Sequence, residues 1–159
     1  METIVIIGYG TAGMTAAGYA SIVNRRAVIK VFEKRPYAIY HPCSLPDVLS
    51  GELDKSRIVE EPPKMPRLEV HTATIVEEVD PSARKVRARN LRNGQVVEAE
   101  YDKLILAAGA RPFIPRAVRI TNSEATFTLR TVEDAVAIAE AMLESIKRNK
   151  IVEPDFTLL

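Results

Sequence analysis

The stretch TIVIIGYGTAG, residues 3–13, decides the fold because it joins an apolar run, a sharp turn and a small-residue segment. The apolar run stops at Gly8, and Gly8, Gly10 and Gly13 follow the spacing G-x-G-x-x-G. In a strand–turn–helix the first glycine permits the turn, the second lets the backbone approach a pyrophosphate, and the third lets helix and strand pack closely. The positive end of the helix then faces the phosphates. The stretch therefore predicts a dinucleotide-binding βαβ unit.

A second apolar run supports this reading of the glycines. Residues 27–32 are almost all apolar and lead directly into Glu33, twenty residues after Gly13. An acid at this distance can accept hydrogen bonds from both hydroxyls of an adenosine ribose. The alternative is an ordinary solvated acid at the end of a strand. We expect a helix over residues 10–23 and a parallel strand over residues 28–32.

Composition bounds the class of protein. The chain has 159 residues, enough for one well-cored domain, and its 47% hydrophobic and 27% charged content is typical of soluble proteins. The 22 basic residues balance the 21 acidic ones, so no bulk field favours nucleic acid or an anionic membrane. No apolar run is long enough to span a membrane, and residues 4–7 lack the flanks of a signal peptide. The single cysteine, Cys43, excludes an internal disulfide and a multi-cysteine metal site, so we expect no metal and a cytoplasmic location.

The middle of the chain changes from loop to strands. Six of the ten prolines lie in residues 34–66, which predicts loop and short helix, with one helical turn at residues 47–50 closing at Gly51. Residues 68–76 alternate like one half-buried strand. Residues 84–89 and 95–101 flank Asn93-Gly94, a hairpin signal, so an antiparallel meander is expected at about residues 74–101. A buried parallel strand follows at residues 104–108.

The last third of the chain predicts a strand and a helix. Residues 125–129 suggest one more short strand. Thr131 is expected to cap a final amphipathic helix that has Glu133 and Asp134 in its first turn. The predicted fold class is α/β, a Rossmann-like domain of residues 1–150 with a parallel sheet, helices and an inserted meander. Residues 151–159 would form a C-terminal tail.

The order of these motifs resembles the pyridine nucleotide-disulfide oxidoreductases. The resemblance rests on the glycine turn with Glu33, on the segment CSLP at residues 43–46, on the meander, and on YDKLILAAGARP at residues 101–112. It is closest to the single-cysteine branch of NADH oxidases, NADH peroxidases and coenzyme A-disulfide reductases, and it covers residues 3–150. It implies an FAD-binding Rossmann-like domain and a flavin-dependent NAD(P)H oxidoreductase.

The resemblance also implies roles for individual residues. The FAD pyrophosphate would be held by the glycine turn, that is by Gly8, Gly10, Thr11, Ala12 and Gly13. Glu33 would bind the adenosine ribose, Lys34 would lie along the adenosine, and the backbone of Val76 would meet the adenine. A second turn would let the chain cross close to the cofactor, and it comprises Ala107, Ala108, Gly109 and Ala110.

Cys43 would be the catalytic redox thiol beside the flavin, cycling through a sulfenic acid or a mixed disulfide with coenzyme A. Either chemistry needs a thiolate. Taken alone, a lone loop cysteine is usually an inert small side chain. His41 could act as a base or be an ordinary surface histidine, and His71 reads as structural. Thr11 stands where the peroxidases have a histidine, which argues against peroxidase chemistry.

The resemblance further implies that relatives continue with an NAD-binding domain, a Gly-Asp motif at the flavin and a dimerisation domain. None of these is expected within the 159 residues, although residues 156–159 resemble the start of a strand of the NAD-binding domain. We therefore expect a segment, a split subunit or a remnant that needs an NAD-binding partner chain or domain and that self-associates through exposed apolar surface. Two alternatives stay open. One is a non-catalytic module that binds FAD or an adenine nucleotide, and the other is a simple dehydrogenase with an NAD site.

Overall fold

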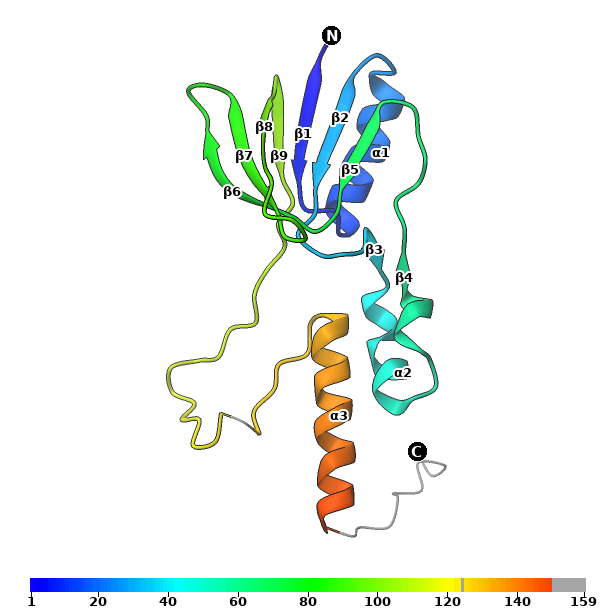
Figure 1. Ribbon diagram of the computed structural model, residues 1–159, viewed down its shortest axis with the longest axis vertical. Coiled ribbons are helices and arrows are strands. Elements are labelled where there is room, and N and C mark those ends of the chain that lie inside the picture. Colours follow the sequence, from blue (N-terminus) through cyan, green and yellow to red (C-terminus); the bar gives the residue numbers. More distant parts are fainter. Residues whose placement is uncertain (124, 150–159) are drawn as a thin grey trace. The chain divides into compact units, whose positions relative to one another are not determined.

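The structure is a computed structural model that describes residues 1–123 and 125–149. The chain divides into two compact units (Figure 1). The first unit comprises Met1–Tyr40 and Val59–Ala110, and the second comprises His41–Ile58 and the chain from Arg111 onward.

A four-stranded parallel sheet forms the centre of the first unit. Its strands are β1 (Thr3–Ile7), β2 (Val28–Phe32), β5 (Leu68–His71) and β9 (Lys103–Leu106), in the order β5-β2-β1-β9. Helix α1 (Thr11–Val23) connects β1 to β2, so the predicted βαβ unit is confirmed, with the helix beginning one residue later than expected. The carboxyl ends of all four strands lie at one edge of the sheet (Figure 1). In open parallel sheets this is the edge at which ligands bind.

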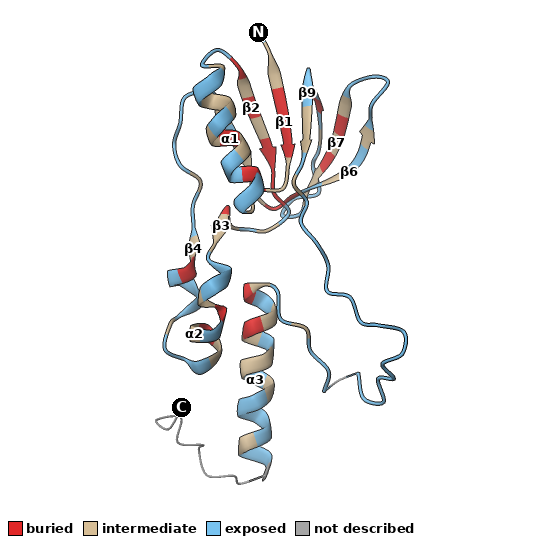
Figure 2. Ribbon diagram, turned by 180° about the vertical axis from the view of Figure 1, so that it is seen from behind, coloured by how far each residue is buried: buried red, intermediate tan, exposed pale blue. Residues whose placement is uncertain are grey.

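Strand β1 is buried on both faces, as its continuous run of apolar residues predicts (Figure 2). Ile4 and Ile6 pack in one cluster with Ala17 of α1, while Val5 packs in a second cluster with Phe32 and Val86. Successive residues of a strand point to opposite faces, so the helix covers one face and the antiparallel strands cover the other. These two layers of side chains fix the position of the glycine turn at the end of β1.

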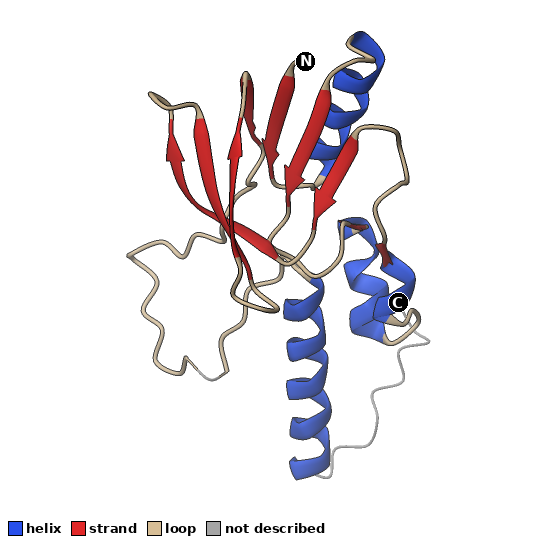
Figure 3. Ribbon diagram, turned by 45° about the horizontal axis from the view of Figure 1, so that its top comes forward, coloured by secondary structure: helices blue, strands red, loops and turns tan. Residues whose placement is uncertain are grey.

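The second sheet is the predicted meander. Strands β6 (Thr74–Asp80), β7 (Lys85–Asn90) and β8 (Val96–Glu100) pair antiparallel in this order (Figure 3). Gly94 in the hairpin has φ +74°, a left-handed conformation that glycine adopts without strain. The α/β class, the parallel sheet and the inserted meander are therefore confirmed.

The expectation of one strand over residues 68–76 is wrong. Ala73 has φ +49°, which turns the chain sharply, and its N–H donates to the carbonyl of Arg35 at 2.7 Å. The Leu91 N–H in turn donates to the carbonyl of Ala73. Residues before this turn therefore join the parallel sheet, and residues after it join the meander. The chain divides here because the backbone of Ala73 is hydrogen-bonded to Arg35 and Leu91, which are distant in the sequence.

A two-stranded antiparallel pair completes the first unit, formed by β3 (Ile39–Tyr40) and β4 (Val59–Glu60). The second unit contains the short 3₁₀ helices Pro42–Ser44 and Lys55–Ile58, and helices α2 (Leu45–Ser50) and α3 (Val132–Asn149). The predicted helical turn is confirmed, and Gly51 ends it with φ +81°. Helices α2 and α3 contact each other, and each contributes buried residues, namely Leu45, Val48, Val132 and Ala135.

The predicted strand at residues 125–129 is absent from the described structure. Phe127 and Leu129 are 44% and 45% exposed, and no described strand lies against them to pair with their backbone. The predicted tail, residues 151–159, lies outside the described residues, as does the resemblance of residues 156–159 to a strand. Among the helices of the described chain, none has the length and apolar character needed to cross a membrane.

Candidate functional site

The glycine turn at the end of β1 is packed so closely that two of its glycines cannot carry a side chain. Gly8 has φ +93°, and a methyl group there would overlap the carbonyl oxygen of Ala107. A methyl group at Gly13 would overlap the carbonyl oxygen of Gly8. The Ala107 N–H donates to the Ile7 carbonyl at 2.8 Å, which holds the two chain segments together. The first and third glycines are therefore explained by backbone packing.

The second glycine lies at the open N-terminus of α1. Gly10 is the N-cap residue, in an extended conformation with no side-chain cap, and the first turn of the helix contains no acid. The first N–H groups of a helix have no partner within it, and they carry the positive end of the helix dipole. Thr11 and Ala12 are exposed, whereas Gly13 is buried. This end of the sheet therefore presents backbone donors suited to an anion.

Glu33, at the end of β2, is buried, with a residue exposure of only 3%. Oε2 of Glu33 accepts from the Tyr9 N–H at 2.7 Å and from Nη2 of Arg35 at 2.7 Å. Its Oε1 accepts from the Arg35 N–H at 2.9 Å and from Nε of Arg35 at 2.8 Å. The carboxylate thus connects β2 to the glycine turn, and the interpretation as a solvated strand-end acid is wrong.

Burial acts to raise the pKa of Glu33, but the hydrogen bonds of Arg35 and Tyr9 and the charge of Arg35 outweigh it, so the pKa lies below its ordinary value. The Arg35 guanidinium lies 4.7 Å from the ring centroid of Tyr40 and 5.5 Å from that of Tyr37. Such geometry allows cation–π attraction. A buried, ionised carboxylate therefore stands at the glycine turn with its own paired cation.

Arg35 is the site residue that sequence reasoning missed. The residue that the resemblance places along the adenosine is Lys34, and Lys34 is exposed in the structure. The chain bends directly after Glu33, so that both the backbone N–H and the side chain of Arg35 turn back onto the carboxylate. The two tyrosines at positions 37 and 40 were the available signal, since arginine stacks on aromatic rings.

The second predicted turn meets the glycine turn at Ala107 and Ala108, since a methyl group at Gly8 would overlap the Ala107 carbonyl and lie 3.2 Å from the Cα of Ala108. Ala107 is the residue at which the chains cross, and Gly109 has φ +75°. Ala108, Gly109 and Ala110 are exposed beyond it. Val76 lies in β6, half-buried and paired with Ala88 in the meander. The structure therefore brings together the glycine turn, Glu33 and Ala107, while Val76 belongs to the meander sheet.

Cys43 belongs to the second unit. It lies in the 3₁₀ helix Pro42–Ser44 immediately before α2, and it is exposed. The backbone on either side is held in place, since the His41 N–H donates to the Ile58 carbonyl at 2.9 Å and Leu45 is buried. The thiol is thus an accessible group on an ordered segment.

His71 stacks on Phe32 with ring centroids 5.1 Å apart.

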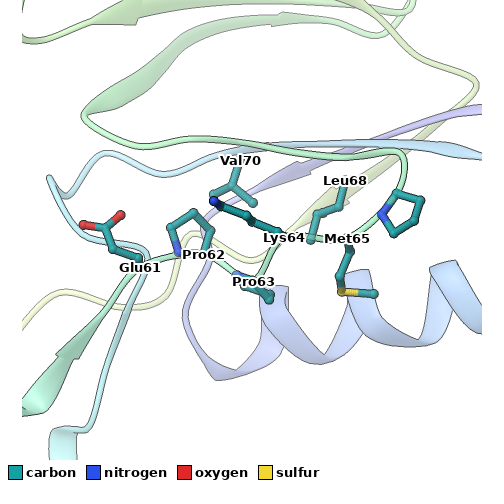
Figure 4. Close-up of a pocket in the computed structure, with 8 residues that line it drawn as sticks. Glu61, Pro62, Pro63, Lys64, Met65, Leu68 and Val70 are labelled. Carbon is teal, nitrogen blue, oxygen red and sulfur yellow. The ribbon is translucent and has the colours of Figure 1, made fainter.

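An open hollow of about 720 Å³ lies elsewhere in the first unit (Figure 4). Its lining comes entirely from the proline-rich segment that leads into β5 and from β5 itself, namely Glu61, Pro62, Pro63, Lys64, Met65, Pro66, Leu68 and Val70. These residues include none of the chemistry-bearing side chains that the sequence singled out.

A parallel sheet with a glycine turn, a helix on one face and a three-stranded antiparallel sheet on the other defines the Rossmann-like fold of flavoprotein reductases. The sequence model described as pyridine nucleotide-disulphide oxidoreductase matches residues 2–152. The chain therefore belongs to the pyridine nucleotide-disulphide oxidoreductase family.

Individual relatives agree with this assignment. The chain is 33% identical over 146 residues to an NADH oxidase of Methanocaldococcus jannaschii, covering 89% of this chain and 32% of that one. It is 34% identical over 154 residues to an NAD(P)H sulfur oxidoreductase (CoA-dependent) of Pyrococcus furiosus, covering 94% and 33%. The chain therefore spans about a third of the length of the curated relatives it matches.

A solved structure is similar in both fold and sequence. The NAD-dependent persulfide reductase from A. fulgidus superimposes with a TM-score of 0.76 at 29% identity, covering 89% of this chain and 28% of that one.

Proposed function

We propose that this chain is the FAD-binding portion of a flavin-dependent NAD(P)H oxidoreductase that uses Cys43 as a single redox cysteine. The observation that carries the proposal is the crossing of the Gly8 turn and Ala107 beside the uncapped N-terminus of α1, in a chain of this family. The names of its relatives, an NADH oxidase and a CoA-dependent sulfur oxidoreductase, support this class of chemistry.

The residues at the glycine turn fit the pyrophosphate of FAD. Gly10 carries no Cβ, and a methyl group built there would have Nη2 of Arg35, at 4.0 Å, as its nearest neighbour, so the space in front of the helix end is open. The N–H groups of Thr11, Ala12 and Gly13 would bind the phosphate oxygens, helped by the helix dipole. Glu33 would receive the adenosine ribose, and residues 107–110 would line the cofactor on the β9 side.

When bound, FAD supplies the transfer of two electrons from NAD(P)H to an oxygen or sulfur acceptor. Cys43 would be the sulfur centre. Reduction of a sulfenic acid at its Sγ releases water, and reduction of a mixed disulfide releases the thiol of the partner molecule. The exposed position of Cys43 gives such a partner access.

NAD(P)H is proposed to bind to a domain or partner chain outside these 159 residues, since the chain spans about a third of its matched relatives. Association with a further polypeptide or a second copy is also proposed. Apolar side chains along α1 and at the end of β9 are more than two-thirds exposed, namely Tyr19, Ile22, Val23 and Leu106. Burying such a surface would stabilise an assembly.

The proposal is tested by purifying the chain and reconstituting it with FAD. We expect a yellow protein that releases one flavin per chain on denaturation. NADH consumption should be slow without a positioned nicotinamide, and it should depend on added FAD. A chain that stays colourless and does not alter FAD fluorescence would overturn the proposal.

The role of Cys43 is tested separately with the variant Cys43→Ser. We expect this variant to retain FAD and to lose reduction of a disulfide acceptor. Disulfide reduction that is unchanged in Cys43→Ser would contradict the redox role.

A further inference from the structure

The carboxylate of Glu33 is already fully used by the protein. An ionised carboxylate has about four lone-pair positions, two on each oxygen. The Tyr9 N–H and Nη2 of Arg35 donate to Oε2, while the backbone N–H and Nε of Arg35 donate to Oε1. A ribose hydroxyl that donates to Glu33 must therefore displace one of these donors.

The donors differ in how easily they can leave. The Tyr9 N–H belongs to the glycine turn, which is fixed by the packing of Gly8 against Ala107. The backbone N–H of Arg35 is fixed because the carbonyl of the same residue accepts from Ala73 at 2.7 Å. The Arg35 guanidinium reaches Glu33 through a flexible side chain, which can move away by rotation without any change in the backbone, so it is the group that can yield.

The guanidinium also lies on the ligand side of the acid. Nη2 of Arg35 is 4.0 Å from the position that a Cβ of Gly10 would take, and Gly10 is the residue at the helix end where the pyrophosphate is proposed to bind. With a side-chain exposure of 15% and two tyrosine rings beside it, Arg35 is held in this position rather than spread into solvent.

We propose, on the premise of the proposed function, that Arg35 competes with the adenosine ribose for Glu33 and thereby sets how strongly the site discriminates nucleotides by their ribose hydroxyls. Arg35 is therefore a specificity-determining residue. The wild-type site gains little from a 2′-hydroxyl, because each new hydrogen bond to Glu33 replaces one from Arg35. Without the guanidinium, a hydrogen bond from the 2′-hydroxyl to Glu33 replaces no other hydrogen bond and therefore strengthens binding.

The test compares the affinities of ADP and 2′-deoxy-ADP for wild type and for Arg35→Leu, near pH 8 so that Glu33 stays ionised. In wild type we expect ADP to bind less than about threefold more tightly than 2′-deoxy-ADP. In Arg35→Leu the ratio should rise to about tenfold or more, since a hydrogen bond to a charged group is then gained without loss of another. Arg25→Leu, at an exposed position before β2, is the matched control and should keep the wild-type ratio.

Two further variants guard against misfolding. Arg35→Lys keeps the charge but offers no planar fork, and we expect an intermediate ratio. Tyr40→Leu loosens the guanidinium without removing any donor to Glu33, and it should raise the ratio modestly. A purely structural role of Arg35 would weaken both nucleotides equally and leave the ratio unchanged.

The outcomes separate the two proposals. If FAD and ADP bind to wild type and every folded Arg35 variant keeps the wild-type ratio, the competition by Arg35 is overturned while FAD binding stands. If wild type binds neither FAD nor ADP, the proposed function fails and the inference fails with it.

Discussion

The two long helices of this chain begin in opposite ways. Helix α3 is closed at its N-terminus by its own residues, since Thr131 Oγ1 accepts from the Asp134 N–H at 3.2 Å and Asp134 accepts from the Thr131 N–H at 2.8 Å. Helix α1 begins at Gly10 with no side-chain cap and no acid in its first turn. A self-capped helix end needs no external partner, whereas an uncapped end retains donors for an anion. The difference distinguishes a structural helix from one that is arranged for a ligand.

The largest expected effect is at Glu33, because this buried acid connects β2 to the turn that precedes the open N-terminus of α1. We expect Glu33→Gln to lower the free energy of unfolding by about 3–5 kcal/mol at neutral pH, since the Arg35 charge loses its partner. Denaturant unfolding measures this loss. Glu77→Gln, at a surface acid paired with Arg87 and Arg89, is the control and should have little effect.

The difference in stability between wild type and Glu33→Gln should depend on pH. The pKa of Glu33 is lowered in the folded state, so its stabilisation is complete above the ordinary glutamate value of about 4.3 and is lost as the pH falls through the lowered pKa. The stability difference between wild type and Glu33→Gln should therefore shrink on acidification. A difference that is constant or grows toward low pH would show that Glu33 is not held as a carboxylate.

The next effect contrasts two glycines of the same helix. Gly13→Ala should destabilise the chain by about 1–3 kcal/mol and abolish FAD binding, because the added methyl group overlaps the Gly8 carbonyl. Gly18→Ala has nothing within 4 Å of the new methyl group, and it should stabilise the helix by about 0.5–1 kcal/mol. Thermal unfolding and flavin content measure both. Equal behaviour of the two variants would refute the close crossing of the chains.

The smallest effect is at the closed helix. Thr131→Ala removes the cap of α3 and should cost about 1 kcal/mol without changing FAD affinity. Thr121→Ala, at an exposed position outside the helix, is the control. A loss of flavin in Thr131→Ala would remove the distinction between a structural and a ligand-binding helix end.

Sequence alone predicted the elements whose cause is local. The Asn93-Gly94 hairpin, Gly51 after α2 and the Thr131 cap each act through neighbours in the chain, and each lies where the sequence predicts it. The spacing of Gly8, Gly10 and Gly13 likewise predicts the turn after β1, but the contact of Gly8 with the distant Ala107 is visible only in the structure. The break at Ala73 was missed because its partners, Arg35 and Leu91, are distant in the sequence.

The missed features of the site have a similar origin. The pattern of residues identified Glu33 as an acid but did not reveal that Arg35 would take both of its oxygens, because that depends on the path of the chain after β2. The strand predicted at residues 125–129 had the right residue types but lacks a neighbouring strand in the described chain. Residue types that favour a strand produce one only when a neighbouring strand is present to pair with the backbone.

The most direct test of the central claim is a titration of FAD into wild type and Gly10→Asp, followed by flavin fluorescence. An aspartate fits the N-cap geometry of Gly10, with φ −68° and ψ −172°, so α1 would become self-capped like α3 while the fold is kept. Its charge would also repel a pyrophosphate. We predict saturable binding by wild type, with a loss of more than about tenfold in affinity for a Gly10→Asp chain of undiminished stability. Equal FAD affinity of the two proteins would contradict the claim that the open end of α1 holds the cofactor.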